Sequence, residues 1–332
     1  MRRPLLGLAG LSVLLSVFAW GVLARAVYAP APSAAPRVQI PRGAGLTQVV
    51  EILYQAGLAP WKAGARWGFL VWGHPKRVKA GIYAFKKGAR LVDVFDDLEH
   101  GRVDLVTVTL PEGLTAREMA AILEAADVTA AERFVALARD PTSPPRWRLP
   151  GPSLEGFLFP DTYRFARELP AGVVVDALIR RFRKASAVLA VEAARQGLDL
   201  HAWVTLASVV EKETGVEGEK PLIAAVFRNR LAAGMRLQTD PTVIYGIENF
   251  DGNLRRSDLE RDTPYNTYTR AGLPAGPIAN PGRSTLEAVL RPAEVPYLYF
   301  VSRNDGTHVF STTYSEHLRA VNLYQRGGRR RT

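Results

Sequence analysis

The segment Leu206-Ala-Ser-Val-Val-Glu-Lys-Glu-Thr214 places one acidic side chain at the end of an apolar helical run. Residues three and four apart share one face of a helix, so we expect Glu211 beside Ser208 and Thr214. That face of small and hydroxyl side chains would leave a polymer free to reach the carboxylate. Glu213 lies roughly 200° further around the helix and points away. The segment therefore predicts a site with a single acid, which excludes the paired carboxylates of a retaining glycosidase.

The sequence around this segment predicts a mixed α+β domain over residues 153–325. Asp199 is typical of an N-cap for the helix that ends near Thr214. Apolar periodicity also predicts helices over residues 173–196 and 221–233, the latter stopping at Gly234. A tight turn at 304–306 between two apolar runs predicts a β-hairpin. Five prolines between residues 140 and 152 indicate a loop or domain boundary before this region.

Three related segments precede that boundary, at residues 38–53, 85–98 and 108–123. Each has the pattern of a short strand, a glycine turn and an amphipathic helix; the first helix carries the spacing Leu46, Val49, Val50 and Leu53. These units predict an α/β region over residues 38–139 that is separate from the acid. Removal of residues 37–123 is accordingly predicted to leave a fold that retains part of its activity.

The N-terminal residues have the composition of a membrane helix. Residues 4–24 carry no charge over 21 positions, and at about 1.5 Å per residue this run spans the roughly 30 Å hydrocarbon layer. Arg2 and Arg3 precede it, which puts residues 1–3 in the cytoplasm and the bulk of the chain outside. We expect a single membrane helix over 4–26, an Ala/Pro-rich spacer over 27–37 and a solvated basic tail over 326–332. The alternative is a cleaved signal peptide, whose apolar region would normally be only about 7 to 15 residues.

The composition narrows the classes of function. The chain has 332 residues, a 47% hydrophobic content and a formal charge of +11, which suit a globular protein with basic surface for anionic lipid or an acidic wall polymer. It has no cysteine, which excludes disulfides and thiolate catalysis. The histidines lack metal-ligand spacing, and there is no phosphate-binding glycine loop or nucleic-acid motif. We therefore expect no cofactor, no metal and no nucleic-acid partner.

Glu211 is the residue to which we assign the chemistry. Glycosidic cleavage needs a carboxylic acid that stays protonated near neutral pH, and burial against apolar groups achieves this. Glu211 follows two valines and fits, although a glutamate near a helix end is more often a solvated surface residue. Polar segments with spaced aromatic residues follow it and suit sugar rings. The candidate substrate-binding residues are Ser208, Thr214, Gln238, Asp240, Tyr245, Tyr265, Asn266, Tyr268 and Asn280.

Six motifs in one order resemble the endolytic murein transglycosylase family, also called YceG-like. Beyond the Leu206–Thr214 segment they are Leu154-Glu-Gly-Phe-Leu-Phe-Pro-Asp-Thr-Tyr163, Gln238-Thr-Asp-Pro-Thr-Val-Ile-Tyr-Gly246, Tyr265-Asn-Thr-Tyr268, Gly272-Leu-Pro-Ala-Gly-Pro-Ile-Ala-Asn-Pro-Gly282 and Thr313-Tyr-Ser-Glu-His317. The resemblance covers nearly the whole chain and implies that residues 38–139 are LysM-like. It also implies that Glu211, the first glutamate of the Glu-Lys-Glu-Thr motif, is catalytic. Ala275 departs from the pattern, where a second proline is common.

The resemblance implies a bacterial cell-membrane lyase that cuts the MurNAc–GlcNAc β-1,4 bond within peptidoglycan strands. Glu211 would donate a proton to the bridging oxygen and then accept one from the C6 hydroxyl, which closes a 1,6-anhydro ring. Such an enzyme would terminate nascent strands beside penicillin-binding synthases of the elongation or division machinery.

Two other interpretations remain open from the residues. A muramidase would use the same acid with a second carboxylate that activates water, for which Asp240 and Asp262 are the candidates. A membrane-tethered scaffold would bind peptidoglycan without turnover. Anhydromuramyl ends, reducing ends or no new ends in digested murein would distinguish the three.

Overall fold

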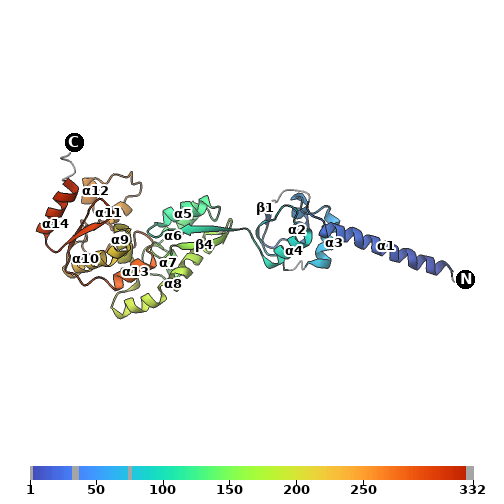
Figure 1. Cartoon of the computed structure of the whole chain (residues 1–332), viewed down its shortest axis with the longest axis horizontal. Coiled ribbons are helices and arrows are strands. Elements are labelled where there is room, and N and C mark those ends of the chain that lie inside the picture. The colour runs from blue at the N-terminus through green and yellow to red at the C-terminus, as the bar shows by residue number, and fades with distance from the viewer. Residues whose placement is uncertain (1–2, 32–36, 74–76, 327–332) are drawn as a thin grey trace. The chain divides into compact units, whose positions relative to one another are not determined.

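The computed structural model describes residues 3–31, 37–73 and 77–326 of the chain. It divides into two compact units (Figure 1). Unit 1 comprises residues 1–106 with 164–167, and unit 2 comprises residues 107–163 with 168–332. Residues 32–36 of the expected spacer and 327–332 of the expected basic tail lie outside the described residues.

Unit 1 packs helices around a short strand pair. Its strands β1 (Arg37–Ile40) and β2 (Gly81–Ala84) are antiparallel, with Arg37 opposite Ala84. Its helices are α1 (Arg3–Tyr28), α2 (Leu46–Gln55), α3 (Lys62–Trp72) and α4 (Leu91–His100). Apolar side chains that recur at helical spacing on α2 and α4 are buried in the core. The helices expected within 38–53 and 85–98 are therefore confirmed.

The end of α1 differs from expectation. The sequence predicted a membrane helix that stops at residue 26 and an extended spacer from residue 27. Instead α1 continues to Tyr28, and Val27, which is fully buried, belongs to the core of unit 1. The Ala31 N–H then donates to the Ala89 carbonyl oxygen at 3.1 Å. This part of the expected spacer is wrong because apolar burial continues the helix into the folded unit.

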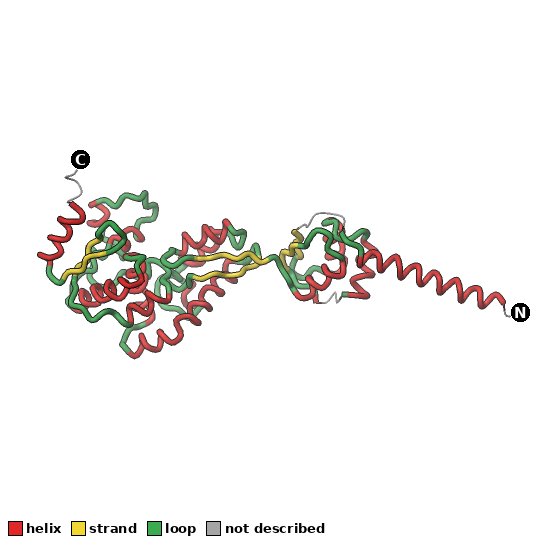
Figure 2. Tube along the Cα trace, viewed as in Figure 1, coloured by secondary structure: helices red, strands yellow, loops and turns green. Residues whose placement is uncertain are grey.

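Unit 2 is mainly helical, with short strands (Figure 2). Strands β3 (Leu105–Leu110) and β4 (Asp161–Ala166) pair, and the boundary between the units falls within both. Strands β5 (Tyr299–Ser302) and β6 (His308–Ser311) form the expected hairpin. The helices are α5 (Ala116–Ala125), α6 (Ala131–Arg139), α7 (Ser143–Arg146), α8 (Ala171–Arg195), α9 (Leu200–Glu213), η2 (Glu217–Glu219), α10 (Lys220–Ala232), α11 (Asp240–Tyr245), α12 (Arg256–Glu260), α13 (Arg283–Leu290), α14 (Tyr314–Val321) and η3 (Asn322–Arg326). The mixed α+β class is confirmed.

Helix α9 runs through the core of unit 2. Asp199 caps it as predicted, accepting the Ala202 N–H at 2.7 Å. Every residue from Trp203 to Val210 is buried, against α8, α10 and α13. The Trp203 indole N–H also donates to the Leu286 carbonyl oxygen on α13, at 2.9 Å. The core ends one residue before Glu211, so the acid sits at the edge of a rigidly packed helix.

The third strand-turn-helix segment belongs to unit 2. The expected α/β region extended to residue 139, whereas the compact units divide at residue 106. Helix α5 packs on α6, and its first N–H, from Ala116, donates to the buried carboxylate of Glu155 at 2.9 Å. The three segments share a local pattern, but the third belongs to the unit that contains α9, and Lys212 of α9 donates to the Gly113 carbonyl oxygen in its turn.

Candidate active site

Glu211 occupies the last turn of α9, with 7% of its side chain exposed. Its Oε2 accepts the Gly282 N–H at 3.0 Å and the hydroxyl hydrogen of Thr285. Its Oε1 lies 3.7 Å from Nζ of Lys220. Gly282 and Thr285 are the N-cap and third residue of α13, so the carboxylate also faces the positive end of that helix dipole. The carboxylate is thus held in one orientation by α13 and α10.

Lys220 is a buried cation at the start of α10, 2% exposed. Its Nζ donates to Glu217 at 2.5 Å and to Oγ of Ser284 at 2.9 Å, and lies 3.6 Å from Oε2 of Glu112. Burial alone would lower the pKa of Lys220. The hydrogen bond that Lys220 donates to Glu217 and the charges of Glu211, Glu217 and Glu112 outweigh burial, so the pKa of Lys220 is raised. A permanent positive charge therefore stands beside the acid.

Glu112 is a second carboxylate beside Glu211. It lies in the turn after β3, and its side chain packs on Gly282, where an added Cβ would come within 1.9 Å of the Glu112 Cδ. Burial, followed by the negative charge of Glu211, raises the pKa of Glu112. Neither Glu112 nor Lys220 was among the site residues predicted from the sequence. A signal existed for Glu112: the equivalent turn positions of the other two segments hold Arg42 and Lys87.

The turn that carries Glu112 covers the end of α9. The Gly113 N–H donates to the Asn280 carbonyl oxygen at 2.9 Å, and the Lys212 ammonium donates to the Gly113 carbonyl oxygen at 3.2 Å. Gly113 has a φ of 77°, and a Cβ there would lie 3.5 Å from Cγ of Glu211. The expected open face around the acid is therefore wrong, because the turn at Gly113, distant in sequence, packs against the Glu211 side chain.

Glu213 lies in a separate environment, as helical geometry predicted. It accepts the hydroxyl hydrogen of Thr239, and burial raises its pKa to about 7. The negative charge of Asp240 acts in the same direction. Asp240 in turn accepts the Tyr268 hydroxyl hydrogen at 2.6 Å. Asp240 and Tyr268 therefore belong with Glu213 and not with Glu211.

Ser208 lies on the same face of α9 as Glu211 but is buried, whereas Thr214 lies outside the helix. The Ser208 hydroxyl donates to the Thr205 carbonyl oxygen and accepts the Ile278 N–H at 3.0 Å, so it anchors a loop inside the core. Thr214 has extended backbone, with φ −147° and ψ 141°, and its hydroxyl donates to Glu219. The prediction that Thr214 shares a face with Glu211 is wrong because α9 ends at Glu213.

The remaining candidates divide between buried connectors and accessible side chains. Asn280 is fully buried; its amide oxygen accepts two backbone N–H groups and its amide nitrogen donates to Glu155 at 2.7 Å. Asn266 is also buried and donates to three backbone carbonyls. The rings of Tyr245 and Tyr265 meet at 4.9 Å, and Gln238 is exposed in a left-handed conformation. Sugar contacts by these residues stay predictions.

The sequence pattern of the YceG-like family matches residues 38–323. The chain belongs to the YceG-like family. An endolytic murein transglycosylase of Bacillus subtilis (strain 168) is 30% identical over 303 residues, covering 86% of this chain and 84% of that protein. An endolytic murein transglycosylase of Streptococcus pneumoniae (strain ATCC BAA-255 / R6) is 27% identical over 322 residues, covering 86% of this chain and 57% of that protein.

A crystal structure of a YceG-like protein from Listeria monocytogenes resembles this one with a TM-score of 0.60. The two are 29% identical, over 86% of this chain and 98% of that one. This member of the YceG-like family is an enzyme of the lytic transglycosylase class. The interpretation as a scaffold without turnover is set aside.

Proposed function

We propose that this YceG-like enzyme is an endolytic transglycosylase of murein, with Glu211 as its one catalytic acid and base. It cuts the MurNAc–GlcNAc β-1,4 bond within a glycan strand and leaves a 1,6-anhydromuramyl end. The observation that carries the proposal is the fixed Glu211 carboxylate, bound by Gly282 and Thr285 and paired with Lys220. The names of the Bacillus and Streptococcus relatives support the substrate.

The two oxygens of Glu211 have different roles in this proposal. Oε2 is occupied by two hydrogen-bond donors, whereas Oε1 faces Lys220 at 3.7 Å, which is longer than a hydrogen bond. Oε1 is therefore the oxygen that carries the transferred proton. It protonates the bridging oxygen as the bond to C1 of the muramyl residue breaks. The C6 oxygen of that residue then bonds to C1, and its proton returns to Oε1.

Lys220 and the start of α13 stabilise the charge that develops during this cycle. After the proton leaves, Glu211 is a carboxylate, and fixed positive groups around it lower the energy of that state without rearrangement. The same groups keep Oε1 in place for the return of the proton. The internal C6 nucleophile removes the need for a second carboxylate.

Mass spectrometry of murein digested by the purified enzyme tests this proposal. Anhydromuramyl ends within cut strands are the expected product. Reducing ends without anhydro ends would overturn the transglycosylase mechanism.

A muramidase is the second candidate function, and the position of Glu112 is the observation that favours it. Glu112 and Glu211 both lie within 4 Å of the Lys220 ammonium nitrogen, at 3.6 and 3.7 Å. The two carboxylates named from the sequence lie elsewhere: Asp240 is bound to Tyr268, and Asp262 pairs with Arg270 at 2.7 Å. A water activated by Glu112 would produce reducing ends.

The setting of the enzyme is part of the proposal. Helix α1 contains an apolar window over Leu11–Tyr28 with a mean hydropathy of 1.8. It serves as a single-pass anchor in the cytoplasmic membrane, with the N-terminus inside and the chain after α1 outside. Unit 1 then holds glycan in the manner of a LysM-like module. The cut site lies beside penicillin-binding synthases of the elongation or division machinery and terminates nascent strands.

A further inference from the structure

Helix α3 packs closely against α1 at two glycines. Gly64 and Gly68 are one helical turn apart and both are buried. A Cβ at Gly68 would lie 2.5 Å from Cγ2 of Val27, and one at Gly64 would lie 3.0 Å from Cβ of Ala26. Only glycine permits so close an approach, which is the packing that small residues allow between membrane helices. Helix α3 is therefore fixed against the last turns of α1.

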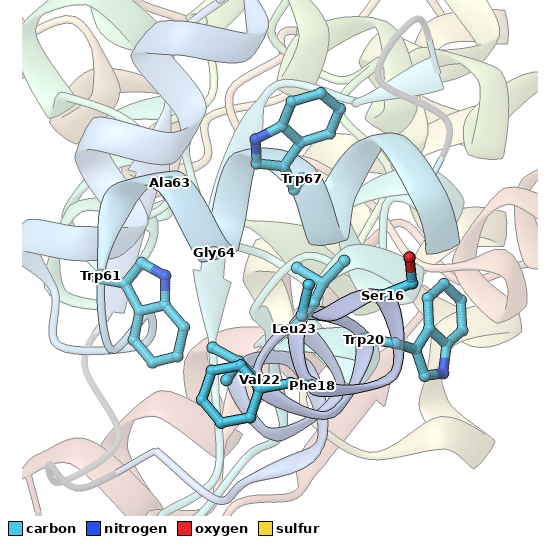
Figure 3. A pocket seen from close by; sticks show the side chains of 10 residues that line it. Ser16, Phe18, Trp20, Val22, Leu23, Trp61, Ala63, Gly64 and Trp67 are labelled. Carbon is cyan, nitrogen blue, oxygen red and sulfur yellow. The ribbon is translucent and has the colours of Figure 1, made fainter. Parts of the chain in front are cut away.

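The contact continues along α1 as an apolar groove of about 520 Å³ (Figure 3). Its walls are mainly aromatic and aliphatic: Phe18, Trp20 and Leu23 of α1 line it together with Trp61, the N-cap residue of α3, and Trp67 of α3. Phe18 precedes Val27 by nine residues, about 14 Å of helix at 1.5 Å per residue. Half of a roughly 30 Å hydrocarbon layer is about 15 Å. Trp61 and Trp67 thus stand beside the part of α1 that would cross the outer leaflet.

The outer face of α3 is apolar where a face toward water would be polar. Trp67 is 61% exposed, Leu70 48% and Val71 47%. The charged side chains of α3 are Lys62 and Arg66, both basic. Tryptophan is enriched at membrane interfaces, and basic side chains reach from an apolar face to anionic headgroups. The composition and the exposure both fit a helix that lies in the headgroup and acyl boundary.

We propose that α3 inserts into the outer leaflet of the cytoplasmic membrane and that phospholipid acyl chains fill the groove between α1 and α3. The inference rests on the proposed anchoring by α1. Three observations favour lipid as the occupant: the groove is continuous with the exposed apolar surface of α1, its rim is aromatic, and the charges on α3 are positive. Unit 1 then contacts the bilayer through α3 as well as through α1.

Cysteine labelling of the full-length chain tests this insertion, because the natural sequence contains no cysteine. Val71→Cys reports on α3, Leu14→Cys on α1, and Val191→Cys is the matched control, a valine on α8 with 53% exposure. Each variant carries an environment-sensitive fluorophore in vesicles of phosphatidylcholine and phosphatidylglycerol. Quenching is measured with nitroxide-bearing phospholipids and with iodide in the outer water.

We expect lipid nitroxide to quench most of the emission at Val71→Cys while iodide has little effect. Val191→Cys should show the reverse. If Leu14→Cys is quenched by lipid but Val71→Cys is as accessible to iodide as the control, α1 is an anchor and the insertion of α3 is wrong. If Val71→Cys is shielded from both quenchers, a second copy of the chain covers this face, which also overturns the proposal. If Leu14→Cys escapes lipid quenching, the anchor itself fails, and the insertion fails with it. Leu70→Cys repeats the measurement at the neighbouring position.

Discussion

Glu211 accepts the backbone N–H of Gly282, the N-cap residue of α13, and this hydrogen bond links the end of α9 to the beginning of α13. The bond satisfies the Gly282 N–H at the start of α13 and also orients the Glu211 carboxyl group. The Glu112 carboxyl group occupies the position that a Cβ at Gly282 would take. The acid, the cap and the second carboxylate therefore form one packed cluster.

The first prediction contrasts the two glutamates of the Glu-Lys-Glu motif. Glu211→Gln should keep the fold and lose nearly all turnover, because an amide of the same shape can neither donate the proton nor take it back. Glu213→Gln should retain most activity, because its amide oxygen can still accept from Thr239. The measurement is anhydro product per purified variant, with circular dichroism as the folding control. Near-wild-type turnover by Glu211→Gln, with Asp240→Asn inactive, would show that the acid is misassigned.

Gly282→Ala should impair the enzyme through Glu112. The new methyl group would take the place of the Glu112 carboxyl and displace the end of that side chain from its position near Lys220. Because the end of a flexible side chain can move aside, we expect a loss of stability at the lower end of the roughly 1–3 kcal/mol range for overpacking, together with a lower kcat. Adding Glu112→Ala removes the obstacle and should restore part of the melting temperature. A double variant no more stable than Gly282→Ala would contradict the proposed collision.

Glu112→Gln separates the two mechanisms. A transglycosylase with the internal C6 nucleophile should still form anhydro ends, with a change in rate but not in product. A muramidase that activates water through Glu112 should lose reducing ends almost completely. Asp240→Asn is the matched control, since Asp240 is bound to Tyr268 near Glu213 and should be tolerated by either mechanism. Mass spectrometry of the products of both variants gives the answer.

Local patterns in the sequence predicted the helices and their starts well, because periodic apolar residues and caps act within a few residues. Asp199 caps α9 and the hairpin turns at 304–306, both as expected. The end of α9 lies within one residue of the prediction, but the extended backbone of Thr214, whose hydroxyl bonds to Glu219, was not predictable in this way. Glu112 and Lys220 could not be grouped with Glu211 because only tertiary packing brings them together.

Removal of residues 37–123 should abolish activity, in contrast to the expectation from the repeated pattern. The deletion removes Glu112 and most of β3 from unit 2. It also removes α5 except for its last two residues. It would also expose the Glu155 carboxylate that accepts the Ala116 N–H. We expect an unfolded or aggregated product by circular dichroism and size-exclusion chromatography. A folded, active deletion variant would mean that unit 2 does not need its first strand and helix.

Glu155 should make the stability of the enzyme depend on pH. It is 4% exposed, and burial raises its pKa to about 7 from an ordinary value of 4.5. The folded state therefore binds this proton more tightly than the unfolded state. Glu155 therefore adds to the free energy of unfolding fully below pH 4.5, and this contribution, on the order of 3 kcal/mol, is lost as the pH rises through 7.

Glu155→Gln isolates this contribution, because an amide of similar shape does not ionise. Glu213 titrates in the same range and in the same direction, so the informative quantity is the difference between the wild type and the variant. Melting temperatures measured from pH 5 to pH 8 should fall more steeply for the wild type than for Glu155→Gln. Parallel curves would show that Glu155 is already ionised in the folded enzyme, held by the N–H groups of Ala116 and Asn280 and the hydroxyl of Tyr245.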